Sequence, residues 1–212
     1  MEKGELQCKF GILSRPDGSV MLSEGNTTVI AGIYGPVEVK MQKVLIEKAA
    51  VECHYRPKSG LPGVEDRFYE SIIRNICETA LAASMFPRSA ISVVIQEMQN
   101  SGELISCAIN AACLACLDSG IDMKCMFAAV SCFLGENNQL SLVPPVNRKE
   151  IKATFVFVFD NICGKIIASH TDGKFSESLY EEALYICMNE SKNIFSFFKK
   201  SLFEREEKGK KK

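Results

Sequence analysis

The segment from Glu103 to Leu117 constrains the fold more than any other part of the sequence, because it is apolar almost all round. Alanine, cysteine, leucine and isoleucine fill most of its positions, over a length typical of a helix. A helix without a polar face has to be buried between layers of other elements. Gly120 follows two polar residues and supplies the left-handed residue that commonly ends a helix. The sequence therefore predicts a central helix with structure on both of its sides.

The residues before this helix are expected to form one of those layers. Leu6–Leu13 and Ser19–Leu22 are predicted to form a hairpin, because Pro16 and Gly18 lie where a tight turn favours them. The spacing of apolar residues changes to that of a helix from Arg67 to Met85. Further strands are expected at Thr27–Ile33, Val44–Tyr55 and Ala90–Met98.

The residues after the central helix predict a second set of strands and a last helix. Ala153–Phe159 is fully apolar and is expected to be a central strand. Ser178 and Glu181 have the spacing of a capping box, which predicts a helix from there to about Phe203. The other expected strands are Lys124–Leu134, Gln139–Val143 and Gly164–Ser169. This order of elements predicts one α+β domain over residues 1–204, with sheets packed on buried helices.

Composition and charge exclude several classes of protein. The 212 residues are 47% apolar and 24% charged, which is typical of a globular chain, and no apolar run reaches the roughly 18 residues of a membrane span. The net charge is −1, but residues 205–212 carry five basic and two acidic residues, so the rest carries −4. A basic nucleic-acid-binding module is excluded, and any RNA contact must be a local patch. Residues 205–212 are expected to be a disordered, solvated tail, with targeting or RNA tethering as the alternative.

The candidate chemical groups do not form a recognisable catalytic site. The ten cysteines lie mostly in apolar runs, which indicates a reducing compartment. Cys113 and Cys116 form a CxxC motif inside the most apolar helix, and a buried pair is favoured over a zinc site. His54 and His170 are the only histidines. Since no converging carboxylates are found either, we predict no metal site and no cofactor.

Three stretches resemble the RNase PH family when their order and spacing are taken together. They are residues 27–37, residues 67–74 with 85–91, and residues 102–120 with the core Asn110–Ala115. The similarity extends from about residue 4 to residue 204. It implies the RNase PH version of the ribosomal protein S5 domain 2-like fold. It also implies a place in a ring of six RNase PH-like subunits, as in the eukaryotic exosome.

The resemblance also indicates where an active site would lie. Active members are phosphorolytic 3′→5′ exoribonucleases whose phosphate site resembles Gly-Gly-Thr-Arg; the corresponding residues here are Gly102, Glu103, Leu104 and Ile105. Glu103 places a negative charge where phosphate would bind at a helix N-terminus. Thr154 stands in the position of one catalytic aspartate, and residues 147–154 contain no aspartate. The resemblance therefore implies that both halves of the site are degenerate and that the chain has no catalytic residue.

A basic helix face is the remaining candidate site. In active relatives the helix that corresponds to residues 67–74 faces the path of the RNA, so Lys58, Arg67 and Arg74 are candidate RNA contacts. The alternative is that the two arginines pair with Glu70 and Glu78 on a solvated face.

Two functions are compatible with these observations. The first is a non-catalytic ring subunit that supports RNA processing and decay. The resemblance implies pairing with exosome component eight, contact with an S1/KH cap protein such as exosome component three, and RNA in the channel. It also implies a location in the nucleus, nucleolus and cytoplasm. The alternative is a metal-dependent nuclease that acts as a homodimer, for example in DNA degradation during cell death.

Overall fold

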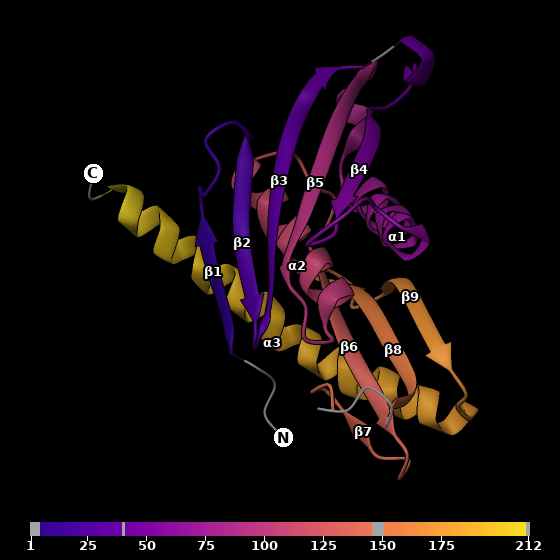
Figure 1. The fold of residues 1–212 in the computed structure, drawn as a ribbon. Helices are drawn as coiled ribbons and strands as arrows, with labels where there is room; N and C mark the ends of the chain where they lie inside the picture. The colour runs from indigo at the N-terminus through magenta and orange to yellow at the C-terminus, as the bar shows by residue number, and fades with distance from the viewer. Residues whose placement is uncertain (1–4, 40, 146–150, 211–212) are drawn as a thin grey trace.

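The computed structural model, which describes residues 5–39, 41–145 and 151–210, contains two sheets with a helix between them (Figure 1). The five-stranded sheet has the order β1-β2-β3-β5-β4 and the four-stranded sheet the order β7-β6-β8-β9. All strand pairs are antiparallel except β4 with β5. The strands of the first sheet are β1 (Leu6–Phe10), β2 (Gly18–Glu24), β3 (Thr27–Glu38), β4 (Ala50–Arg56) and β5 (Ser89–Gln99). Those of the second are β6 (Phe127–Gly135), β7 (Leu140–Ser141), β8 (Ile151–Asp160) and β9 (Ile166–Gly173).

Helix α2 (Leu104–Ser119) is the central helix that the sequence predicted. It contacts β2, β3 and β5 on one side and β6 on the other, and every residue from Ser106 to Cys116 is buried. Gly120 ends it with φ of 71°, in the left-handed region. The expected α+β architecture, with a buried helix between sheets, is confirmed.

Asn110 joins α2 to the second sheet. Strand β7 pairs with β6 only at Phe133 and Leu134, so it leaves the same edge of β6 open farther along the strand. At Ala129 the side chain of Asn110 closes that edge. Its amide nitrogen donates to the Ala129 carbonyl over 2.9 Å, and its oxygen accepts the Ala129 N–H over 2.8 Å. A buried side chain thus replaces the missing neighbouring strand and satisfies two backbone groups.

The other two helices cover the outer parts of the molecule. Helix α1 (Val64–Ala80) packs on β4, and the long helix α3 (Glu177–Lys210) packs on β6 and β8 and extends as far as β1 (Figure 1). Short 3-10 turns are found at Met41–Lys43 and Ala83–Met85. Among the described residues, no helix combines the length and the apolar composition that crossing a membrane requires.

Several element boundaries differ from those predicted, because long-range contacts set them. Helix α1 begins at Val64, where the Asp66 carboxylate accepts the N–H of Gly63 over 2.8 Å. It ends at Ala80, since Leu81 adopts an extended backbone conformation and bridges to Met123. Strand β4 begins at Ala50 rather than at Val44. Strand β3 continues past the predicted end at Ile33 to Glu38, and α3 begins at Glu177, so Ser178 lies inside the helix instead of capping it.

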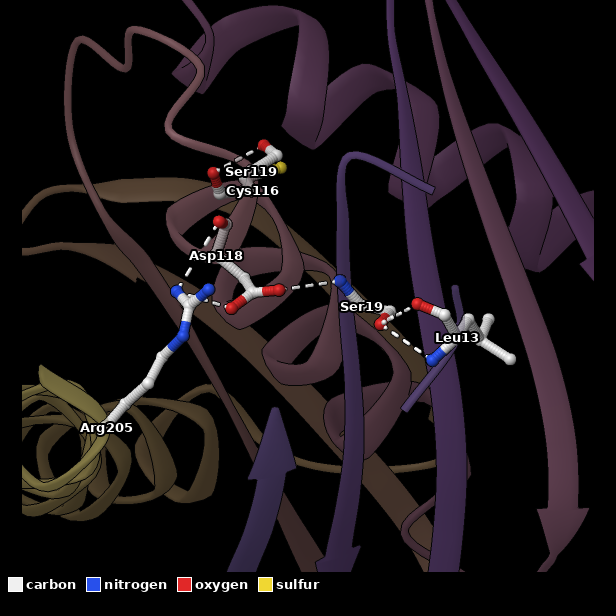
Figure 2. Close-up of polar contacts among 6 residues, drawn as sticks. All are labelled: Leu13, Ser19, Cys116, Asp118, Ser119 and Arg205. Atoms are coloured by element: carbon white, nitrogen blue, oxygen red, sulfur yellow. Dashed lines mark hydrogen bonds and ion pairs between the residues drawn. The ribbon is translucent and has the colours of Figure 1, made fainter. Parts of the chain in front are cut away.

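The charged end of the chain continues α3 beyond the predicted boundary at residue 204. Arg205 pairs with Asp118, whose side chain is only 3% exposed, at 2.5 Å (Figure 2). The same carboxylate accepts the backbone N–H of Ser19 over 2.8 Å. The guanidinium also lies 5.5 Å from the centre of the Phe10 ring. Arg205 is therefore an anchored residue of a helix, where the sequence had predicted a solvated tail.

Candidate functional site

The residues aligned with the family's phosphate site form the turn between β5 and α2. The backbone N–H of Gly102 donates to the Asn100 side chain over 2.9 Å, and Gly102 has φ of 125°, which favours glycine. Glu103 is the N-cap residue and its side chain is 4% exposed. Leu104 is buried and Ile105 packs against the hydrophobic core. The first turn of α2 therefore begins with a buried glutamate and two apolar residues, and none of the four aligned positions carries a cation.

Pro144 covers this turn. A Cβ placed on Gly102 would lie 2.9 Å from the Cβ of Pro144, closer than side chains approach one another. The sequence could not reveal this contact, because Pro144 lies some forty residues farther along the chain, just after β7. The space beside the helix N-terminus is thus occupied by protein.

Thr154, the residue aligned with a catalytic aspartate, lies in β8. Its cross-strand partners are Phe133 on β6 and Asp172 on β9. A strand was expected to end at Ser169, but β9 continues through Asp172 to Gly173. One carboxylate therefore lies beside the Thr154 position on the neighbouring strand, and sequence spacing alone did not reveal it. Residues 147–150, which belong to the same predicted segment, lie outside the described residues.

The candidate RNA contacts lie on α1 and on the loop before it. Lys58, Arg67 and Arg74 are all exposed. Within the described part of the chain, neither guanidinium forms an ion pair. Both glutamates have other contacts: Glu78 pairs with Lys48, and Glu70 accepts the backbone N–H of Tyr55 over 3.4 Å. The alternative pairing of the arginines with Glu70 and Glu78 is therefore not formed among the described residues.

Arg74 lines a hollow of about 210 Å³ between β4 and α1, which Lys58 and Arg67 do not line. Glu70 lies in the same hollow, so the local charge is mixed. The thiol of Cys53 forms part of its wall, and burial raises the pKa of this thiol to about 12, with a smaller contribution from Glu70. This thiol is a packing group at neutral pH, because only the thiolate is a nucleophile.

The other candidate groups also have packing roles. Cys113 and Cys116 are fully buried in α2, which confirms the predicted core pair, and burial raises the pKa of Cys113. A hydrogen bond with Cys187 lowers the pKa of Cys132, but both side chains are buried. The His170 ring packs edge-on against Phe68, with the centroids 5.0 Å apart. In the described ranges, no group of three or more histidine, cysteine or acidic side chains could hold a metal ion.

Comparison with known proteins agrees with this architecture. The family model described as "3′ exoribonuclease family, domain 1" of RNase PH matches residues 2–122, more than half of the chain. The chain belongs to the RNase PH family. Its α2 helix and the turn before it lie inside the matched range.

Two relatives and one solved structure extend the RNase PH match beyond residue 122. The "exosome complex exonuclease RRP46 homolog" of Arabidopsis thaliana is 39% identical over 157 residues, which are 74% of this chain and 66% of that protein. The "exosome complex component rrp46" of Schizosaccharomyces pombe is 31% identical over 202 residues, 92% of this chain and 88% of that protein. The crystal structure of rice Rrp46 has a TM-score of 0.89 at 28% identity and covers 95% of both chains.

Proposed function

We propose that this RNase PH chain is a non-catalytic structural subunit of an exosome ring, of the type called RRP46 or exosome component five. The observation that carries the proposal is the closed turn before α2, where Glu103 is buried and Pro144 covers Gly102. A helix N-terminus binds phosphate through free N–H groups and positive potential. A buried carboxylate and a covering proline oppose both. The names of the relatives support the exosome assignment.

In such a ring the chain would provide contact surfaces for neighbouring subunits and would not catalyse RNA cleavage. We propose exosome component eight as its neighbour in the ring and an S1/KH cap protein, exosome component three, as a contact outside the ring. Large exposed apolar side chains at the start of α1 support a role in assembly: Leu61 is 91%, Val64 87% and Phe68 46% exposed. We propose the nucleus, nucleolus and cytoplasm as its locations.

We further propose that Lys58, Arg67 and Arg74 contact RNA in the channel. Their exposure and the absence of ion pairs to the arginines in the described residues support this, since RNA binding depends mainly on basic groups that are free to reach phosphates.

An assay of the purified full-length chain tests the absence of catalysis. Labelled RNA is incubated with the chain and inorganic phosphate, and the release of nucleoside diphosphates is compared with a mock preparation and a known phosphorolytic enzyme. We expect no release above the mock preparation. Release that is abolished by omitting phosphate would contradict the proposal.

The same preparation tests the alternative of a metal-dependent nuclease. RNA and DNA are incubated with the chain in the presence of Mg²⁺ or Mn²⁺, with EDTA as the control. Our proposal predicts that neither nucleic acid is cleaved. Cleavage that co-purifies with the folded chain and disappears with EDTA would favour the homodimeric nuclease.

A further inference from the structure

Strand β1 has a backbone edge that its own sheet does not use. It is the terminal strand of the five-stranded sheet. The N–H of Gly25 donates to the Glu5 carbonyl over 3.3 Å, and the N–H of Gly11 donates to the Ser19 carbonyl over 2.8 Å. In this register the odd-numbered residues of β1 exchange hydrogen bonds with β2, so the backbone groups of the even-numbered residues point away from it.

Leu6 and Phe10 carry this open edge. The outward N–H and C=O groups of both residues have no hydrogen-bond partner among residues 5–39, 41–145 and 151–210. Exposed strand edges of this kind are templates for pairing with another chain.

A groove runs beside the open edge. Two adjoining hollows, of about 470 and 520 Å³, lie between β1 and the C-terminal part of α3, and they share Cys8, Lys9, Ser201 and Glu204 in their walls. Together they follow the chain from Leu6 to Ile12. Seven residues of extended chain span about 23 Å, so the groove has the length of an ordinary strand. In Figure 1, α3 crosses behind β1, and its residues Ser201 and Glu204 line both hollows.

The walls of the groove indicate which side chains would fit. Phe10 and Phe197 offer partly buried apolar surface. Lys9 and Lys200 are exposed cations, whereas Arg205 is already paired with Asp118 (Figure 2). Glu204 is the one carboxylate among the lining residues. The side chains available to a ligand therefore carry a net positive charge beside an apolar floor.

We propose that the groove between β1 and α3 binds an extended acidic segment of a partner protein, which adds a strand to the edge of β1. Main-chain hydrogen bonds to Leu6 and Phe10 would hold it in register, as in other cases of strand addition. Because side chains alternate along a strand, its apolar residues would face Phe10 and its acidic residues would face Lys9, while Phe197 and Lys200 border the groove on α3. This site is separate from the α2 turn and from α1, and it goes beyond the proposed ring function.

A binding experiment with the full-length chain tests this proposal. The probe is a fluorescent seven-residue peptide that alternates glutamate and valine and has blocked ends. We expect saturable binding by fluorescence anisotropy, and at least tenfold weaker binding when Lys9→Glu is combined with Lys200→Glu. Lys199→Glu is the matched control, since Lys199 is exposed on the same helix but does not line the groove. Glu204→Gln should strengthen binding by removing the opposing charge.

Two further readouts identify the binding mode and the occupant. Methylating one alternate set of the peptide's backbone nitrogens, the set that faces β1, should abolish binding, whereas methylating the other set should not, and the bound peptide should slow amide exchange at Leu6 and Phe10. Failure of the peptide to bind, or equal binding of the methylated peptide, would overturn the proposal. Two results for the double variant would also overturn the proposal if the peptide does not bind. One is a change in the sedimentation of the chain alone, and the other is a loss of oligouridylate binding. Those results would assign the groove to a second copy or to RNA and would leave the ring assignment unaffected.

Discussion

Asp118 and Arg205 show how one buried carboxylate joins three distant segments of the chain. Asp118 lies at the end of α2, accepts the N–H of Ser19 at the start of β2, and pairs with Arg205 near the end of α3 (Figure 2). Removing the cation leaves a carboxylate that is 3% exposed with less compensation for its burial. The contact thus helps to hold the end of α3 against the first sheet, together with the buried Phe198 and Ser201.

We expect Arg205→Ala to lower the free energy of unfolding by about 1.5–3 kcal/mol, the usual range for a hydrogen bond to a charged group. Part of the loss also reflects the contact with the Phe10 ring. Urea unfolding followed by circular dichroism measures it. Lys199→Ala, an exposed change on the same helix, is the control and should alter stability by less than about 0.5 kcal/mol. Equal effects of the two substitutions would contradict the role of the pair.

Buried thiols make the stability of the chain sensitive to alkaline pH. Burial raises the pKa of Cys53 to about 12, and it raises the pKa values of Cys113 and Tyr55 as well. Unfolded thiols ionise near pH 8.5, so above that pH the unfolded state binds fewer protons than the folded state. We therefore expect the free energy of unfolding to fall as pH rises from about 9 towards 12, by ~1.4 kcal/mol per pH unit for each thiol.

Urea unfolding between pH 8 and 10.5 measures this slope. In Cys53→Ala the slope should be smaller by the contribution of one thiol, even if the variant is less stable at every pH. A flat dependence in the unaltered chain, or an identical slope in the variant, would show that these thiols do not control alkaline stability.

At the scale of elements, the sequence predicts those helices and strands whose position follows from a local apolar pattern. It does not predict the boundaries that contacts between distant residues determine. Helix α2 and the central strand β8 were predictable, because their apolar pattern leaves no surface position for them. The start of α1 was placed too late and its end was expected near Met85, because the Asp66 cap and the bridge from Leu81 to Met123 had no periodic signal.

The α2 turn aligned with the family's phosphate site was predictable in composition but not in geometry. Glu103, Leu104 and Ile105 are visible in the sequence once the resemblance is known. The cover by Pro144 and the position of Asp172 opposite Thr154 depend on the pairing of strands that are distant in sequence.

Asn110 provides a test of how α2 holds the second sheet. Asn110→Ala should cost roughly 2–5 kcal/mol, because it leaves both the N–H and the C=O of Ala129 buried without their partner. Amide exchange at Ala129 should also become faster. Ser106→Ala is the control, since the Ser106 hydroxyl is buried on the same helix but, among the described residues, donates only to the Glu103 carbonyl one turn away. If both variants unfold at the same urea concentration, Asn110 does not have this role.

The α1 face has its own test in the assembled complex. Combining Arg67→Glu with Arg74→Glu should leave assembly intact and weaken RNA crosslinking, because phosphate contacts need free cations. The slope of log binding constant against log salt should become shallower by about one unit for each lost contact. Lys192→Glu on α3 is the control, because it replaces one exposed basic residue by glutamate, as each of the two arginine substitutions does. If crosslinking and the salt slope equal those of the unaltered complex, the two arginines do not contact RNA and only form a solvated helix face.

At the scale of the whole molecule, the fold keeps the architecture of its family while the turn aligned with the phosphate site is filled. The likeness to rice Rrp46 covers 95% of the chain, so both sheets and the central helix of that fold are present here. Under the proposed function, the buried Glu103 at the turn before α2 would leave this fold a role in shape and assembly.

The most direct test of this account is the composition of the complex that contains the chain. The full-length chain carries a tag, is purified at its native expression level, and its partners are quantified by mass spectrometry. The account predicts the other RNase PH-like ring subunits in amounts equal to the tagged chain, together with an S1/KH cap protein. Recovery of the chain alone or as a homodimer, with ring subunits absent or far below equal amounts, would contradict it.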